Sequence, residues 1–279
     1  AENGCENVRS ITPADVKKKV AVIGGGPAGL EAARVAALRG HSVTLFERET
    51  ELGGQLNLAC LPPRKSEMRR ATQDLIHAVQ RAGVRLCLGC TVTEQQLLDE
   101  KFDAVIVAVG AHNAAPAIPG KENINVADAW SVLAGREQVY GKVAVIGGGL
   151  VGSETAELLA EQGCHVSVIE MMDKIAAAES TTILPTLMES FKAHGVQQFP
   201  GHKVKQFTTD AVICENKDGA EVTIPCDYIV LAMGARPNAW DTAALEAAGV
   251  QVERIGDCAE KAADISNAIR TGYDTACKI

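Results

Sequence analysis

The sequence is poor in aromatic residues and has no long hydrophobic run. Phe, Trp and Tyr make up 4% of its 279 residues, which leaves few side chains on which nucleic-acid bases could stack. The net charge of −8 argues against nucleic acid or an anionic membrane surface as a partner. No apolar stretch approaches the length of a transmembrane helix. We therefore expect no nucleic-acid partner and no membrane partner.

The sequence also lacks the features of a secreted, disulfide-bonded protein. Its nine cysteines are odd in number and scattered, which favours a reducing compartment over a disulfide framework. The polar N-terminus, Ala1 to Gly4, shows no secretory signal, so we expect a cytoplasmic protein. The absence of an initiator Met indicates an excerpt or a processed chain. A length of 279 residues predicts roughly two domains.

An internal repeat organises the chain. Residues 20–47 read VAVIGGGPAGLEAARVAALRGHSVTLFE and residues 143–170 read VAVIGGGLVGSETAELLAEQGCHVSVIE, with 14 of 28 positions identical at a constant offset of 123. A second echo joins DAVIVAVGA at 103–111 to DYIVLAMGA at 227–235. The repeat predicts two units of one architecture, each with an opening and a closing strand.

Each repeat has the pattern of a βαβ unit. A β-branched run (20–23 and 143–146) predicts a buried parallel strand, and an Ala- and Leu-rich stretch (28–39 and 151–162) predicts a helix. Gly40 and Gly163 stand where a helix C-cap favours glycine, and a second strand follows at 42–46 and 165–169. Further helices are predicted at 65–81, 184–193 and 265–277. Further strands are predicted at 84–88, 105–109, 204–207, 211–215 and 222–224. The expected fold is α/β, with two tandem Rossmann-like dinucleotide-binding domains, parallel sheets and small antiparallel additions.

Glycines follow the first strand of each unit in the pattern GxGxxG. The first glycine permits the tight turn, the second lets the backbone approach a pyrophosphate, and the third lets helix and strand pack closely. The phosphates would then meet free N–H groups at the positive end of the helix dipole. The six positions are Gly24, Gly26, Gly29, Gly147, Gly149 and Gly152.

An acidic residue ends the second strand of each unit, Glu47 in the first and Glu170 in the second. A carboxylate at this point of a Rossmann unit accepts hydrogen bonds from the ribose hydroxyls of a dinucleotide. The alternative is two structural turns with surface glutamates. Glu170 would also repel a 2′-phosphate, and no Arg follows it, so NAD(H) is favoured over NADP(H); Lys174 is an objection.

Two dinucleotide sites in one chain predict hydride exchange between a flavin and a nicotinamide. Hydride transfer requires reacting atoms about 3–3.5 Å apart, and the protein supplies orientation while the cofactors supply the chemistry. We therefore name no general acid, base or nucleophile.

The chain resembles the two-dinucleotide-domain flavoproteins. More narrowly, it is similar to the C-terminal FAD- and NAD(P)H-binding region of the 2,4-dienoyl-CoA reductase, 2-enoate reductase and trimethylamine dehydrogenase group. The matching segments are GGGPAGLEAARVAALRGH, ELGGQL at 51–56, KVAVIGGGLVGSETAELLAEQG, GARPN at 234–238 and IGDC at 255–258. The resemblance extends from about residue 19 to the end of the chain.

The resemblance implies that the first unit binds FAD and the second binds NADH. It places Glu47 at the adenosine ribose, Arg48 near the adenine, the backbone of Val92 at the adenine, and Asp257 at the ribityl or phosphate region. The helix from 265 would point its N-terminus at the flavin pyrimidine edge. The remaining family positions are Gly53, Gly54 and Gln55 beside the flavin, Gly110 after the closing strand, and Gly234 in GARPN.

The chain departs from the full members of that group in length. These carry an N-terminal (β/α)₈ barrel with FMN and an iron–sulfur cluster, for which there is no room here, and Cys5 has no partners at cluster spacing. Within the chain itself we expect a linker at 1–18, an FAD-binding domain at 19–125 and 237–279, and an NAD(H)-binding domain at 126–236.

Two further features have competing interpretations. Glu154, in the first turn of the second Rossmann helix, either faces the nicotinamide or is a helix N-terminal acid favoured by the dipole. Cys87 and Cys90 form CxxC, but the segment is predicted as a strand, where three residues span about 10 Å, too far for a disulfide.

Three functions fit these observations. The favoured one is an electron-input module, in which NADH reduces FAD and the electrons pass to an upstream FMN and iron–sulfur barrel domain. The second is a self-standing NADH-dependent flavin or ferredoxin-type reductase or oxidase. The third is a nucleotide-binding module without catalysis.

Overall fold

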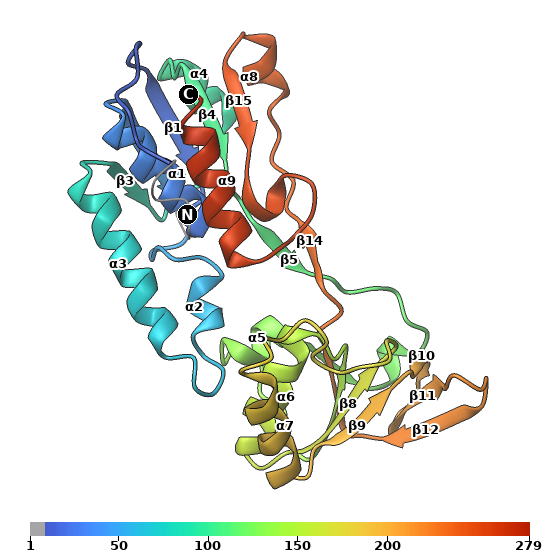
Figure 1. Cartoon of the computed structure of the whole chain (residues 1–279). Helices are drawn as coiled ribbons and strands as arrows, with labels where there is room; N and C mark the ends of the chain where they lie inside the picture. The colour runs from blue at the N-terminus through green and yellow to red at the C-terminus, as the bar shows by residue number, and fades with distance from the viewer. Residues whose placement is uncertain (1–8) are drawn as a thin grey trace. The chain divides into compact units, whose positions relative to one another are not determined.

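The computed structural model describes residues 9–279, which divide into two compact units (Figure 1). Unit 1 contains the described residues up to Cys60, together with Glu67–His112 and Arg236–Ile279. Unit 2 contains Leu61–Ser66 and Asn113–Ala235. Cys5 lies outside the described residues. The short strands β5 (Ala111–Asn113) and β14 (Ala235–Pro237) lie in the segments that join the units and pair with each other.

Unit 1 is built on a five-stranded parallel sheet in the order β15-β4-β1-β2-β3. The strands are β1 (Lys19–Ile23), β2 (Ser42–Glu47), β3 (Arg85–Leu88), β4 (Ala104–Val107) and β15 (Gln251–Arg254). Its helices are α1 (Pro27–Leu38), α2 (Leu56–Ala59), α3 (Glu67–Arg81), α4 (Glu94–Asp99), α8 (Ala243–Ala247) and α9 (Ile265–Ala276), with a 3₁₀ turn at Gly256–Cys258.

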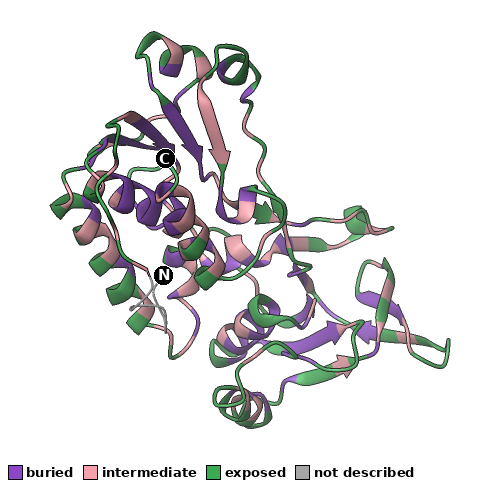
Figure 2. Cartoon of the chain, turned by 45° about the horizontal axis from the view of Figure 1, so that its top comes forward, coloured by how far each residue is buried: buried purple, intermediate pink, exposed green. Residues whose placement is uncertain are grey.

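The two faces of this sheet are covered by different helices because side chains alternate along each strand. Val20 and Val22 of β1 face a core shared with α1, α3 and α9. Ala21 and Ile23 face a second core, to which α4 and α8 contribute. The central strands are buried on both faces, as their β-branched composition predicts (Figure 2).

Unit 2 repeats this sheet in the order β6-β13-β7-β8-β9, again parallel. The strands are β6 (Asn125–Asp128), β7 (Lys142–Ile146), β8 (His165–Glu170), β9 (Gln197–Pro200) and β13 (Tyr228–Leu231). One face packs on α5 (Ala129–Leu133), α6 (Leu150–Glu161) and α7 (Leu184–Ala193), and a 3₁₀ turn lies at Lys121–Asn123.

The other face of the unit 2 sheet is covered by strands instead of helices. An antiparallel sheet of β10 (Lys203–Phe207), β11 (Ala211–Glu215) and β12 (Glu221–Pro225) contributes Phe207, Val212 and Ile224 to a core with Ile146 and Leu231 of the parallel sheet. The expected α/β fold with tandem Rossmann-like units and small antiparallel additions is confirmed. Its layers are α/β/α in unit 1 and α/β/β in unit 2.

The observed elements differ from the expected ones mainly at their ends. Helix α3 begins at Glu67 instead of residue 65, because Lys65 and Ser66 belong to unit 2. The closing strand β4 ends at Val107 instead of residue 109, where the chain turns toward Gly110, which has a φ of 68°. The two compact units meet at 112/113, and the domain boundary at 125/126 stays a prediction.

The repeat extends to a hydrogen bond that joins the opening and closing strands. In unit 1 the N–H of Lys19 donates to Oδ2 of Asp103 at 2.7 Å, and in unit 2 the N–H of Lys142 donates to Oδ2 of Asp227 at 2.8 Å. In each unit the residue that precedes the closing strand therefore accepts, with its carboxylate, the first N–H of the opening strand. This bond helps to set the register of the two strands.

His41 makes the stability of unit 1 depend on pH. The side chain is 6% exposed, and its Nδ1 accepts the N–H of Lys18 at 3.1 Å, so the imidazole is held neutral. Burial, with Arg39 and Lys18 nearby, lowers the pKa of His41 below its ordinary 6.5. Because the folded-state pKa is depressed, the contribution to stability is complete above pH 6.5 and is lost as the pH falls toward the folded-state pKa.

We expect the free energy of unfolding to fall between pH 7 and pH 5, and the substitution His41→Asn to flatten part of that fall. An Asn oxygen can accept the same N–H but does not titrate. Urea unfolding at four pH values measures the slope, and His194→Asn, at an exposed position, serves as the control. A slope that is the same in His41→Asn and the unmodified chain would contradict this assignment.

No helix among residues 9–279 is both long enough and apolar enough to cross a membrane.

Candidate functional site

The first and third glycines of each motif are required by the protein's own backbone. Gly24 and Gly147 have φ values of 107° and 100°, which glycine adopts readily and other residues rarely do. A Cβ on Gly24 would overlap the carbonyl oxygen of Ala108, and a Cβ on Gly29 would overlap that of Gly24. Gly152 has the same relation to Gly147 in unit 2. These four glycines therefore let strand, turn and helix pack closely.

The second glycine of each motif has no such internal explanation. Gly26 has a φ of −77° and Gly149 a φ of −69°, which any residue adopts. No heavy atom lies within 4 Å of the place where a Cβ would stand on either residue. Both glycines are N-caps without a side-chain capping bond, so N–H groups of α1 and α6 lack a side-chain acceptor there. The open space at a helix N-terminus fits a pyrophosphate in both units.

The carboxylates of Glu47 and Glu170 lie against these turns in matching geometry. Oε2 of Glu47 accepts the N–H of Gly25 at 2.5 Å, and Oε1 accepts the N–H of Glu49 at 2.9 Å. Oε2 of Glu170 accepts the N–H of Gly148 at 2.7 Å, and Oε1 accepts that of Met172, also at 2.7 Å. Each carboxylate is thus fixed beside the glycine turn, where a ribose adjoining the pyrophosphate would lie.

Unit 1 brings together several predicted residues that are far apart in sequence. Nε2 of Gln55 donates to Oδ2 of Asp257 at 3.3 Å, and the N–H of Ala263 donates to Oδ1 of Asp257 at 3.0 Å. A Cβ on Gly110 would stand 3.5 Å from Nε2 of Gln55, and a Cβ on Gly54 would stand 2.9 Å from Cα of Gly26. The glycine turn, the loop Gly53–Gln55 (the GGQ loop) and Asp257 therefore lie side by side in unit 1.

The remaining predicted residues take more varied positions. Gly53 has a φ of 117°, and a side chain there would overlap Asn57; Gly234 has a φ of 86° and open space around it. Arg48 is exposed and pairs with Glu49 at 3.1 Å, so its predicted place near the adenine stays a prediction. Val92 is 5% exposed and packs in the second core of unit 1, so a contact of its backbone with the adenine stays a prediction.

Glu154 has an ion-pair partner that the sequence did not indicate. Its side chain, 13% exposed, pairs with Lys65 from the segment Leu61–Ser66. Burial raises the pKa of Glu154, and the ion pair with Lys65 opposes that rise. The neighbouring Arg64 pairs with Glu157 and Glu161 of the same helix. Only the run Arg64-Lys65 after two prolines marks this segment in the sequence, and that pattern does not point to a partner.

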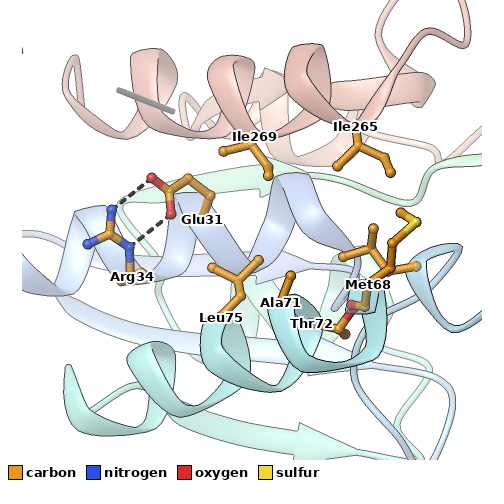
Figure 3. A pocket seen from close by; sticks show the side chains of 9 residues that line it. Glu31, Arg34, Met68, Ala71, Thr72, Leu75, Ile265 and Ile269 are labelled. Carbon is orange, nitrogen blue, oxygen red and sulfur yellow. Dashed lines mark hydrogen bonds and ion pairs between the residues drawn. The ribbon is translucent and has the colours of Figure 1, made fainter. Parts of the chain in front are cut away.

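Helix α9 begins at Ile265, as predicted, and is capped by Asp264, whose side chain accepts the N–H of Asn267 at 2.7 Å. A cavity of about 350 Å³ in unit 1 lies elsewhere, between α1, α3 and α9, and is lined by apolar side chains such as Leu75 and Ile269 (Figure 3). It is lined by none of the motif glycines, so cavity size does not locate the dinucleotide sites.

The described cysteines are free thiols, Cys87 and Cys90 among them. Burial raises the pKa of Cys214 to about 11 and that of Cys226 to about 12, which keeps both protonated and unreactive. Residues 9–279 contain no group of three or more His, Cys, Asp or Glu side chains that could hold a metal ion.

Comparison with known proteins agrees with this geometry. The family model described as pyridine nucleotide-disulphide oxidoreductase matches residues 18–272. The chain is 57% identical to the bilirubin reductase of Mediterraneibacter gnavus, covering 98% of this chain and 42% of that protein. It is 39% identical to the NADH oxidase of Thermoanaerobacter brockii, covering 99% of this chain and 43% of that protein.

A solved structure shows the same arrangement. A 2-naphthoyl-CoA reductase complex superposes with a TM-score of 0.88 at 31% identity, over 97% of this chain and 41% of that one. The chain thus spans less than half the length of each of these three relatives. The predicted resemblance to two-dinucleotide flavoprotein reductases and the predicted oxidoreductase class are confirmed.

Proposed function

Because the chain belongs to the pyridine nucleotide-disulphide oxidoreductase family, whose members bind FAD and NAD(P)H, we propose that it is an electron-input module that passes electrons from NADH to FAD. Unit 1 would hold FAD and unit 2 would hold NADH. When bound, NADH supplies a hydride that FAD accepts, so that NADH becomes NAD⁺ and FAD, with a proton from solvent, becomes FADH₂.

The observation that carries this proposal is the doubled dinucleotide cradle. Each unit offers an N-cap glycine with open space around it, uncapped N–H groups at a helix N-terminus, and a carboxylate held beside the turn by two backbone N–H groups. The turns would bind pyrophosphate, and Glu47 and Glu170 would orient the riboses. In unit 1, Gln55 and Asp257 would orient the flavin end of the dinucleotide.

The electron acceptor is proposed from the length of the relatives. The first two match this chain over only 42% and 43% of their own lengths, which leaves more than half of each for further domains. We propose that electrons leave toward such a domain, of the FMN and iron–sulfur barrel type, and that the protein works in the cytoplasm, where its free thiols persist.

A second candidate is an NADH oxidase that uses a small soluble acceptor. It is favoured by one observation, the 39% identity to a protein of that name. Turnover of NADH by the chain alone in air would support this candidate, whereas flavin reduction without turnover would support the electron-input module.

An absorbance spectrum tests the proposal directly. We expect the purified chain, supplied with FAD, to retain a flavin spectrum after gel filtration and to lose it on anaerobic addition of NADH, with NADPH acting much more slowly. Removal of NADH and anaerobic addition of a chemical oxidant such as ferricyanide should restore the spectrum. A chain that retains no flavin, or a retained flavin that NADH does not bleach, would refute the proposed function.

A further inference from the structure

The internal repeat reveals a charge difference between the two dinucleotide-binding helices. At the offset of 123, Glu31 and Arg34 of α1 correspond to Glu154 and Glu157 of α6. In unit 1 the side chain of Glu31 is 5% exposed, and both its oxygens accept hydrogen bonds from Arg34 at 2.8 Å (Figure 3). Helix α1 thus neutralises its buried carboxylate with its own cation.

Helix α6 cannot neutralise its carboxylates in this way. The position of Arg34 is taken by Glu157, whose side chain is 4% exposed, and the sequence of α6, LVGSETAELLAE, contains no Lys or Arg. Burial raises the pKa of Glu154, and the nearby charge of Glu157 contributes to the rise. The buried carboxylate of Glu157 and the largely covered carboxylate of Glu154, one turn apart, therefore need cations from another segment, because an uncompensated buried charge is strongly destabilising.

Those cations come from Leu61–Ser66, which we name the strap. Arg64 pairs with Glu157 and, at 3.5 Å, with Glu161, while Lys65 pairs with Glu154. Arg64 has a φ of 63°, a left-handed conformation that a residue other than glycine keeps only when its surroundings demand it. The two prolines before it, Pro62 and Pro63, restrict the backbone further. The strap is therefore an anchored segment.

The strap is also covalently continuous with unit 1 on both sides. The residues before it, up to Cys60, include helix α2 and the GGQ loop of the proposed flavin site, and the residue after it, Glu67, begins α3. The strap and its ion pairs thus belong to unit 2, although in sequence the strap lies directly between α2 and α3 of unit 1.

We propose that Arg64 is a positioning residue for hydride transfer, acting through Glu157 by anchoring the strap to helix α6. The anchored strap restricts the movement of the segment that follows the GGQ loop, and so keeps that loop in the conformation that orients the bound flavin. This proposal rests on the proposed function, because it assumes FAD in unit 1 and NADH in unit 2.

The first test measures, in the absence of coenzymes, how firmly the strap is held. Trypsin cleaves after Lys65, and mass spectrometry measures how fast that bond is cut in the folded chain. We expect cleavage to be roughly tenfold faster in Arg64→Gln, because local opening exposes the strap, and close to the unmodified rate in Arg64→Lys. Arg70→Gln, on the neighbouring helix α3, is the control and should leave the rate unchanged.

A second variant separates loss of anchoring from loss of folding. Glu157→Arg gives α6 the arrangement of α1, with an arginine three residues after the buried glutamate, so Glu154 keeps a partner while Arg64 is repelled. We expect this variant to unfold at a temperature close to that of the unmodified chain and yet to be cleaved as fast as Arg64→Gln. Unchanged cleavage in both variants would overturn the anchoring.

The second test measures the rate at which NADH reduces the bound flavin, by stopped-flow absorbance. We expect the rate at saturating NADH to fall about tenfold in Arg64→Gln and Glu157→Arg, with NADH affinity changed less than about twofold, since only the reactive geometry is affected. Faster cleavage with an unchanged reduction rate would overturn the positioning role alone. Absence of bound flavin in the unmodified chain would overturn the proposed function and the positioning role together, while the cleavage result would still stand.

Discussion

Replacing Gly26 by alanine is expected to abolish tight FAD binding while leaving unit 1 folded. The φ of −77° suits alanine, and no protein atom lies within 4 Å of the new Cβ, so the apoprotein should lose at most about 1 kcal/mol, the cost of a poorer N-cap. The Cβ would instead enter the space proposed for the pyrophosphate. We expect affinity for FAD to fall at least about a hundredfold, or roughly 2.7 kcal/mol, as measured by fluorescence titration of the apoprotein.

The matched control is Gly29→Ala, three residues further along the same motif. Its Cβ would overlap the carbonyl oxygen of Gly24, so the packing of α1 on β1 should suffer, with a cost of about 1–3 kcal/mol or more. Thermal unfolding of the two apoproteins should therefore differ, with only Gly29→Ala losing several degrees. If a folded Gly26→Ala chain binds FAD with undiminished affinity, the pyrophosphate does not bind at this turn.

The same contrast is available in unit 2, where Gly149 has open space and Gly152 faces the carbonyl oxygen of Gly147. Gly149→Ala should weaken NADH binding and leave the flavin spectrum intact. The two second-glycine variants would thus assign one coenzyme to each unit. Loss of flavin from Gly149→Ala would indicate the reverse assignment.

The parts of the site that were predictable from sequence are local. Gly24, Gly26 and Gly29 lie within one strand, turn and helix, and Glu47 follows at the end of the next strand, so short-range backbone geometry determines all four positions. The second repeat shows the same residues in the same order, which makes chance unlikely as an explanation. The parallel sheets also follow from the sequence, because β-branched runs of this length that alternate with helices pair in parallel.

The parts that were not predictable depend on contacts between distant segments. Arg64 and Lys65 meet α6 across about ninety residues of sequence, and no periodicity relates the two segments. The replacement of Arg34 by Glu157 is visible when the repeats are aligned, yet its consequence appears only once Glu157 is seen to be buried and Glu154 to be only 13% exposed. Likewise, the short strands of 203–225 were expected, but their role as the cover for one face of the unit 2 sheet was not.

The preference for NADH is expected to depend on Glu170 and to decline when its charge is removed. A carboxylate and a phosphate about 4 Å apart repel each other by about 4 kcal/mol per pair of unit charges near a protein surface. Glu170→Gln should therefore reduce the ratio of NADH to NADPH reduction rates by at least about tenfold. Anaerobic stopped-flow measurement of flavin reduction with each coenzyme gives the ratio.

The substitution Glu170→Gln changes the hydrogen bonds of this side chain as well as its charge. Glu170 accepts the N–H groups of Gly148 and Met172, and a glutamine oxygen can replace only one of its two acceptors. Some weakening of both coenzymes is therefore expected, and the ratio of their rates is the decisive quantity. Glu47→Gln, the same change at the matching turn of unit 1, should lower flavin content and leave the ratio unchanged. If Glu170→Gln also leaves the ratio unchanged, discrimination lies elsewhere, with Lys174 as the nearest basic side chain in sequence left to test.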